Sequence, residues 1–185
     1  MKSKKILALF AAGMISFATS ANAAYNLTLC GASPGGLWSM LGAGVDAAVK
    51  KSHPGSIVTY QTSGGGFANV GLLEQGKCDL ALIHDAEAVL ARDGKAPFKE
   101  PIDGIRTVAV MYTWAPMQMI MNKDFAKEHG ISKLSDIAKN KAPVRVLPNK
   151  LGNVARQVGA SMLAAAGADA EQINSWGGYV VFAAS

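Results

Sequence analysis

The amino-acid sequence predicts an α/β fold built on a largely parallel sheet. From residue 25 onward, short runs rich in β-branched and aromatic residues alternate with segments whose apolar residues recur at helical spacing. This alternation is typical of strand–helix–strand units. Of the 185 residues, 50% are hydrophobic and 17% are charged, a composition that builds a core and excludes a disordered chain. The length suits one globular domain or one and a half.

The first 23 residues have the pattern of a secretory signal peptide. A basic start, MKSKK, precedes the apolar run ILALFAAGMISFA, and Ala21-Asn22-Ala23 fits a cleavage site. The apolar run is too short for a comfortable membrane span, so we expect export followed by cleavage. Three of the 18 basic residues and none of the 13 acidic residues lie in this segment, which leaves the exported chain a net charge of about +2. A surface for nucleic acid is therefore not expected.

In the first half of the chain, each expected strand leads into an expected helix. The helix after the first strand has Leu37, Leu41 and Val45 at helical spacing, which predicts its buried face, and His53-Pro54-Gly55 ends it. The stretch at residues 95–104 contains two prolines and is expected to be a loop. The expected strands are residues 25–30, 56–61 and 79–84, and the expected helices are residues 36–51, 67–76 and 85–94.

Two apolar runs in the middle of the chain, residues 105–113 and 116–122, are separated at Trp114-Ala115-Pro116. Their length and position predict a crossing between two lobes rather than a simple hairpin, with the first lobe at residues 24–112 and the second at residues 113–185. The second lobe is expected to be incomplete, because its elements are too few to finish a sheet. These elements are helices at residues 125–130, 134–140 and 152–167, and strands at residues 144–148 and 179–185.

Four strand-to-helix turns are candidates for holding a small anion. They are residues 31–36, 62–66 and 84–85 in the first lobe and residues 149–153 in the second. The carboxyl ends of parallel strands meet at one edge of a sheet, and the first N–H groups of each following helix attract negative charge. The three glycines at residues 64–66 are followed by Phe67 and Ala68 in place of the lysine and hydroxyl residue of a nucleotide-binding loop. Two interpretations of this turn are left: a site for a small anion, with a carboxylate as the first candidate, or a purely structural tight turn.

The candidate ligand residues lie at these turns and at the crossing between the lobes. Trp38 either floors the pocket or packs in the core. We favour Asp85 as the N-cap of its helix and His84 as a ligand donor. Arg156, in the first turn of the helix at residues 152–167, is a candidate clamp for a carboxylate. The full set is Gly35, Gly36, Trp38, Ser63, Gly65, Gly66, Asn69, His84, Asp85, Trp114, Asn153 and Arg156.

The two cysteines, Cys30 and Cys78, allow two interpretations. A disulfide would persist in an exported chain, whereas unpaired cysteines behave as small buried hydrophobic side chains. The sequence leaves both open. No motif of a nucleophilic enzyme is present, and no cluster of residues has metal-ligand spacing. We therefore expect a protein that is not an enzyme, with no cofactor and no metal.

The order of these motifs resembles one family of transport proteins. The run GASPGGLWSMLGAGVDAAVKKSHPGSIVTYQTSGGGFANVGLLEQGKCDLALIHDAEAVLARDG is similar to the solute-binding proteins of TRAP transporters of the TAXI type, as are VAVMYTWAPMQMIMN and VRVLPNKLGNVARQVGASMLAAAG. The resemblance implies a two-lobed periplasmic-binding-protein-like fold of type II, in a monomeric periplasmic protein that closes on a small organic anion such as glutamate or 2-oxoglutarate. It also implies transfer of this cargo to the membrane permease subunits, and a family pattern that extends beyond residue 185.

The resemblance places the family's binding motifs on specific positions, with substitutions. A Gly-Gly-x-Tyr-Tyr motif appears as residues 35–39 with Trp38 and Ser39 in the tyrosine places. A Gly-Ser-x-x-Asn motif appears as residues 65–69 and ends at Asn69, and a Gly-Ser-Gly-Thr motif appears as residues 150–153.

Two alternatives stay open at this point. The glycine turn is also similar to that of periplasmic phosphate-binding proteins of ABC transporters, for which Thr62, Ser63 and Asp85 would supply contacts. An exported enzyme or a sensor-associated binding module is the other alternative.

Overall fold

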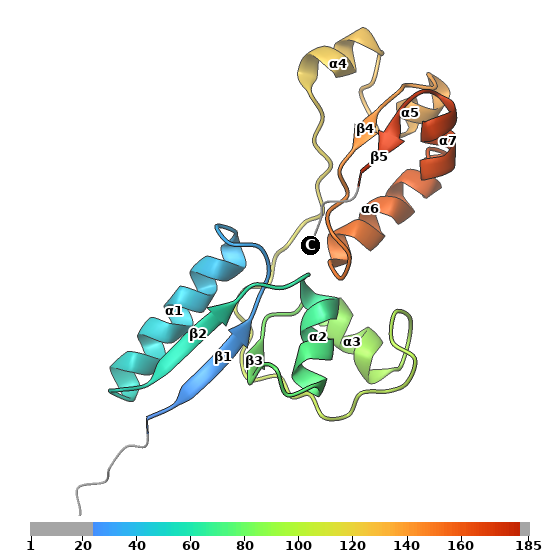
Figure 1. Ribbon diagram of the computed structural model, residues 1–185. Helices are drawn as coiled ribbons and strands as arrows, with labels where there is room; N and C mark the ends of the chain where they lie inside the picture. The colour runs from blue at the N-terminus through green and yellow to red at the C-terminus, as the bar shows by residue number, and fades with distance from the viewer. Residues whose placement is uncertain (1–23, 182–185) are drawn as a thin grey trace, which may run out of the picture.

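The computed structural model describes residues 24–181 and shows two separate parallel sheets, each with its own helices (Figure 1). A three-stranded sheet has the order β2-β1-β3, and a two-stranded sheet pairs β4 with β5. The predicted α/β fold with parallel strands is thereby confirmed. We call the two sheets with their helices the first unit (β1–β3, α1–α3) and the second unit (β4, β5, α4–α7). The predicted signal peptide lies outside the described residues.

The first unit winds strand and helix alternately around a central strand. β1 (Asn26–Cys30) pairs in parallel with β2 (Ile57–Gln61) on one side and with β3 (Leu80–Ala81) on the other. Three helices follow the three strands: α1 (Leu37–Ser52), α2 (Gly66–Glu74) and α3 (Asp85–Arg92). Since the strands are parallel, the turns that lead into the helices all lie at the same edge of the sheet, as the sequence predicts.

Helix α1 packs on the sheet, and one residue of the predicted buried face, Leu37, is not part of it. Leu37 is 55% exposed, whereas Trp38 and Gly42 are buried. A side chain at Gly42 would overlap the ring of Tyr60 on β2, and so would one at Gly31. The Tyr60 ring therefore needs both glycines, and it brings α1 close to the strands. Its hydroxyl accepts a hydrogen bond from the Ala32 N–H (2.7 Å), which fixes the start of the first turn.

A disulfide joins Cys30 at the end of β1 to Cys78 just before β3, with a Cα–Cα distance of 5.9 Å. Both cysteines are also buried. Of the two interpretations open at the level of sequence, the disulfide is the one found. A disulfide is maintained in oxidising compartments, so the bond indicates an extracytoplasmic location.

The segment at residues 105–121 is extended and forms no strand with any described residue. It runs from the first unit to the second, as the predicted crossing requires (Figure 1). Its apolar side chains are largely exposed, with Val108 at 82% and Ile120 at 91%. The sequence carries strand propensity there, but a strand needs a neighbour for its backbone N–H and C=O groups. The boundary between lobes at residue 112 falls in this segment and stays a prediction.

The second unit places a short sheet among four helices. β4 (Arg145–Val146) and β5 (Tyr179–Val180) pair in parallel. The core residues Ile137, Ala142, Val144, Leu163, Ala168 and Ile173 are buried between the sheet and its helices. The helices are α4 (Lys123–Glu128), α5 (Ser135–Lys139), α6 (Val154–Ala165) and α7 (Ala170–Ser175).

One helix of the second unit is absent from the sequence prediction. Helix α7 was not expected, although Asp169 and Gln172 form the capping box that begins it. The buried positions of α6 are Gly159 and Leu163. None of the helices among residues 24–181 is both long and apolar enough to cross a membrane.

Candidate functional site

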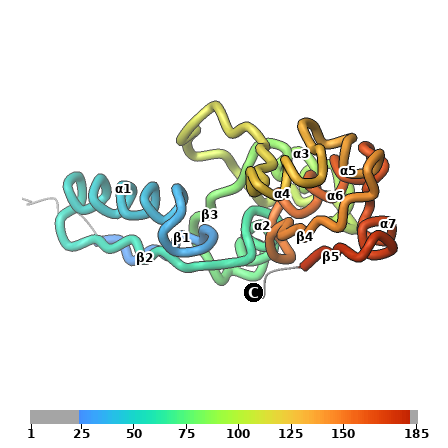
Figure 2. The backbone as a smooth tube through the Cα atoms, turned by 90° about the horizontal axis from the view of Figure 1, so that it is seen from above, coloured from blue at the N-terminus to red at the C-terminus, as the bar shows by residue number. Residues whose placement is uncertain are grey.

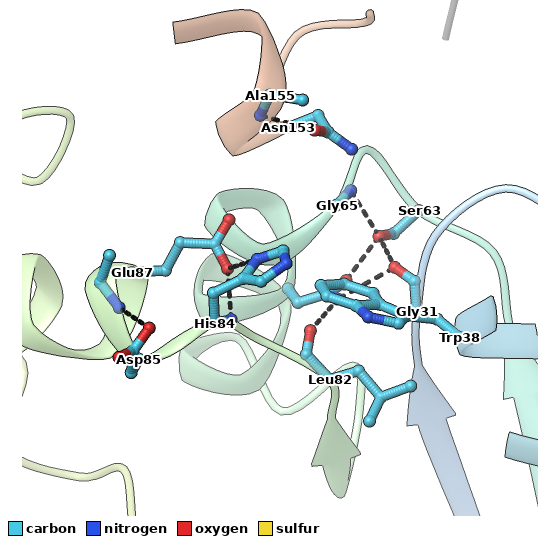
Figure 3. Close-up of polar contacts among 12 residues, drawn as sticks. Gly31, Trp38, Ser63, Gly65, Leu82, His84, Asp85, Glu87, Asn153 and Ala155 are labelled. Atoms are coloured by element: carbon cyan, nitrogen blue, oxygen red, sulfur yellow. Dashed lines mark hydrogen bonds and ion pairs between the residues drawn. The ribbon is translucent and has the colours of Figure 1, made fainter. Parts of the chain in front are cut away.

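The three turns that follow β1, β2 and β3 converge at one corner of the first unit, beside the first turn of α6 from the second unit. In the view of Figure 2 this corner lies between the blue-green first unit and the orange second unit. Figure 3 shows its main side chains, namely Trp38, Ser63, His84, Glu87 and Asn153. The convergence follows from the parallel sheet, and it brings the predicted turns of both units together.

Ser63 and Asn69 tie the first three turns to one another. The Asn69 side-chain amide donates hydrogen bonds to the carbonyl oxygens of Gly31 (2.9 Å) and Leu82 (2.7 Å). The Ser63 hydroxyl contacts the Gly31 carbonyl oxygen and the Asn69 side-chain oxygen and accepts from the Gly65 N–H. Because Asn69 is completely buried, its hydrogen bonds hold the turns in place. Direct contact of these two residues with a ligand stays a prediction.

The first two glycines of the 64–66 run lie against the second unit. A Cβ at Gly64 would be 2.7 Å from the Leu151 carbonyl oxygen, and one at Gly65 would be 3.0 Å from the Asn153 side-chain nitrogen. Gly65 also has φ +118°, a backbone conformation that other residues rarely adopt. Facing them, a Cβ at Gly152 would be 3.0 Å from the Ala68 Cβ. The two units therefore meet here almost backbone to backbone.

The third glycine lies against a buried carboxylate. A side chain at Gly66 would overlap the carboxylate of Glu87 from α3. Glu87 is 0% exposed, and its Oε1 has no hydrogen-bond partner among the described residues. Gly66 is the first residue of α2, where unpaired N–H groups favour negative charge. The Glu87 carboxylate thus lies where the sequence predicts that α2 attracts an anion.

His84 is held by the same carboxylate. Glu87 Oε2 accepts a hydrogen bond from the His84 backbone N–H (2.7 Å) and lies 3.1 Å from His84 Nδ1. The hydrogen bond with Glu87 raises the pKa of His84 above its ordinary value, although partial burial acts against it. His84 is the N-cap of α3 and Asp85 is the first helical residue, so the prediction of Asp85 as N-cap is wrong by one position. The reason is that Glu87 closes the turn from the third helical position.

Trp38 forms an aromatic wall with His84. The two ring centroids are 5.0 Å apart, and the Trp38 indole N–H donates to the Tyr112 hydroxyl (2.7 Å). Trp38 is buried, so it packs in the core while one side of its ring contacts the corner. Tyr112 belongs to the extended segment between the units, which therefore reaches the site.

The remaining candidates are spread around the corner. Gly35 and Gly36 lie in an exposed turn, and no described atom lies within 4 Å of the position a Cβ would take at Gly35. Asn153 is the N-cap of α6 and accepts from the Ala155 N–H (2.9 Å). Arg156 is half-buried in the first turn of α6. Trp114 is 78% exposed, and its place in the site stays a prediction.

Two cavities lie away from this corner. One of about 280 Å³ lies at the end of α2, beside residues 98–102. The other, of about 990 Å³, lies in the second unit between residues 117–122, β4 and α6. Neither is lined by one of the twelve candidate residues. Within residues 24–181, no group of three or more His, Cys, Asp or Glu side chains could hold a metal ion.

Sequence reasoning missed Glu87, the only side chain of the corner that is both charged and completely buried among the described residues. The signal was present, because a glutamate three residues after a helix N-cap is the pattern of a capping box. The sequence does not show that Gly66 lies against this carboxylate, because their contact depends on the packing of α2 against α3.

Parallel sheets in two units, with strand-to-helix turns from both units meeting at one corner, define a protein of the periplasmic-binding-protein-like class. A protein-family model described as the NMT1-like family matches residues 29–180, and the chain belongs to this family of solute-binding proteins, which is related to the TAXI binding proteins and is generally non-catalytic. No curated protein and no solved structure matches the chain significantly.

Proposed function

We propose that this chain is the periplasmic solute-binding subunit of a TRAP transporter and that it captures a small organic anion for the membrane permease subunits. One observation carries the proposal: Trp38 at the start of α1 contacts the His84 ring, and Asn153 at the start of α6 lies against Gly65 at the same corner. Helix N-termini from two units and a histidine offer hydrogen-bond donors to a carboxylate from several sides.

The same geometry makes phosphate the weaker candidate. A phosphate site needs several free hydroxyl groups, but the Ser63 hydroxyl is engaged with Gly31, Gly65 and Asn69. In addition, the Glu87 carboxylate lies beside the first residue of α2, the helix that would receive the phosphate. We therefore propose a carboxylate ligand, bound chiefly by the turns before α1 and α6 and by His84, and a protein that works as a monomer.

The test is a thermal melt of the exported chain with glutamate, 2-oxoglutarate, succinate or inorganic phosphate. A ligand at 100 times its dissociation constant stabilises by about 2.7 kcal/mol, which is about 5–11 °C for a chain of this size. We expect a carboxylate to raise the melting temperature. A melt that none of these anions shifts would refute the proposed ligand class.

A matched pair of variants locates the site. Asn153 and Asn122 are both N-caps, of α6 and α4, and each accepts a backbone hydrogen bond of 2.9 Å. Asn153→Ala and Asn122→Ala should each lose about 1 kcal/mol of stability. Only Asn153→Ala should also reduce the shift produced by the ligand, because Asn122 lies at the far helix α4. An equal loss of ligand response in both variants would argue against the site.

A further inference from the structure

The His84–Glu87 pair gives the corner a charge that depends on pH. Glu87 is completely buried and Oε2 lies 3.1 Å from His84 Nδ1, whereas the His84 side chain is 29% exposed. The carboxylate therefore orients the ring and occupies one nitrogen. Figure 3 shows the other edge of the ring turned away from Glu87, toward the indole of Trp38. Because Glu87 Oε2 occupies Nδ1, we assign the contact with a ligand to Nε2.

We propose that His84, oriented by Glu87, is the proton-dependent donor for an oxyanion of the ligand, so that the protein takes up its anion more tightly at acidic than at alkaline pH. This inference rests on the proposed function. With the ring protonated, Nε2–H carries a positive charge toward the ligand and the buried carboxylate is neutralised. With the ring neutral and its Nδ1–H donated to Glu87, Nε2 carries a lone pair and offers an oxyanion no hydrogen bond.

The other groups around His84 favour the same direction. On α3, Asp85 adds a second negative charge that stabilises the protonated ring. On α1, Trp38 contributes an aromatic face and no charge, and on α2 the neighbour of the pair is Gly66. From the second unit, Arg156 lies in the first turn of α6 and Lys150 lies in the turn that precedes it. The charge of Arg156 does not change between pH 5 and 9, so it cannot produce the pH dependence.

Histidine NMR tests the pair without any ligand. The chain has three histidines, at positions 53, 84 and 129, and His84→Gln assigns the signal. We expect the midpoint of His84 to lie above the ordinary histidine value of 6.5, and Glu87→Gln to lower it. A His84 midpoint at or below 6.5, or no response to Glu87→Gln, would overturn the role given to Glu87.

Calorimetric titration with 2-oxoglutarate between pH 5.5 and 8.5 tests the ligand contact. Carboxylates are ionised throughout this window, since their reference pKa is about 4, so the pH dependence belongs to the protein. We expect the affinity to be constant below the pKa of His84 in the free protein and to fall by up to tenfold per pH unit above it. His84→Gln should remove this slope. His129→Gln, at the end of α4, should keep it.

The outcomes separate this inference from the proposed function. Binding that is tight but independent of pH, or a slope unchanged in His84→Gln, would overturn the inference and leave a carboxylate-binding protein. Binding at no pH, to 2-oxoglutarate or to glutamate, would overturn both.

Discussion

Removal of the Cys30–Cys78 disulfide should destabilise the protein by about 4 kcal/mol. The bond joins positions 48 residues apart in the sequence. In the chain-entropy model, a loop of this length restricts the unfolded chain by roughly 14 cal/mol/K, which is about 4 kcal/mol at 25 °C. For a protein of this size, that corresponds to a fall in melting temperature of about 8–16 °C. The closed loop contains α1, β2 and α2, which lie at or lead to the corner.

The assay compares the oxidised protein, the reduced protein and the double variant Cys30→Ala/Cys78→Ala by thermal melting. We expect the reduced protein and the double variant to melt at similar, lower temperatures. Because the bond acts mainly on the unfolded state, the folded proteins should give similar circular dichroism spectra. Thiol titration in denaturant is the control, and it should find no free thiol before reduction and two per chain afterwards.

The reasoning would be refuted by two free thiols in the protein isolated under oxidising conditions. It would equally be refuted by a melting temperature that reduction leaves within about 2 °C of the oxidised value. In either case the two buried cysteines would be packing residues, and the bond would contribute little to stability.

Three further predictions concern single residues. Gly66→Ala places a Cβ on the Glu87 carboxylate, so chemical denaturation should show a loss of about 1–3 kcal/mol of stability. The control is Gly71→Ala on the same helix, where the nearest atom would be 3.9 Å from the new Cβ. This variant should be neutral or more stable by up to about 1 kcal/mol. Asn69→Ala leaves buried carbonyl groups without donors and should cost about 2–3 kcal/mol of stability. Asn140→Ala loses two exposed hydrogen bonds and should cost less than half of that. Equal losses of stability would contradict the role of Asn69. Hydrogen bonds from the N–H and hydroxyl groups of Ser132 and the N–H of Lys133 lower the pKa of Asp136, so the stability they contribute is present above the ordinary value of 3.8 and is lost as pH falls through the folded value. Between pH 2 and 6, the melting temperature of Asp136→Asn should therefore change less with pH than that of the unchanged protein.

The order of strands and helices in the first unit could be predicted from sequence because its signals are local. β1, α1, β2, α2 and α3 each have a periodic apolar pattern and a glycine or proline at an end. Residues 105–121 have the same strand propensity and are extended without a partner. Propensity is a property of the segment, whereas pairing depends on a neighbour that the local sequence does not describe.

The candidate site was predictable to the level of its turns but not of its side chains. The parallel strands place turns 31–36, 62–66 and 84–85 together, which follows from the alternation alone. Which groups face outward depends on hydrogen bonds across the corner. Asn69 points inward to the carbonyl groups of neighbouring turns, and Glu87 is buried behind His84. Both are distant in sequence from some of the atoms they contact, so no local pattern indicates their orientation.

The contact between Gly64, Gly65 and residues 151–153 acts as a mechanical stop. Because backbone meets backbone there, with a Cβ at Gly64 only 2.7 Å from the Leu151 carbonyl oxygen, the two units can approach no further. A larger residue at position 64 or 65 would hold the two units further apart, by a distance that grows with the length of its side chain. The glycines thus set the smallest distance between the units, and a series of larger residues at these two positions would increase that distance in steps.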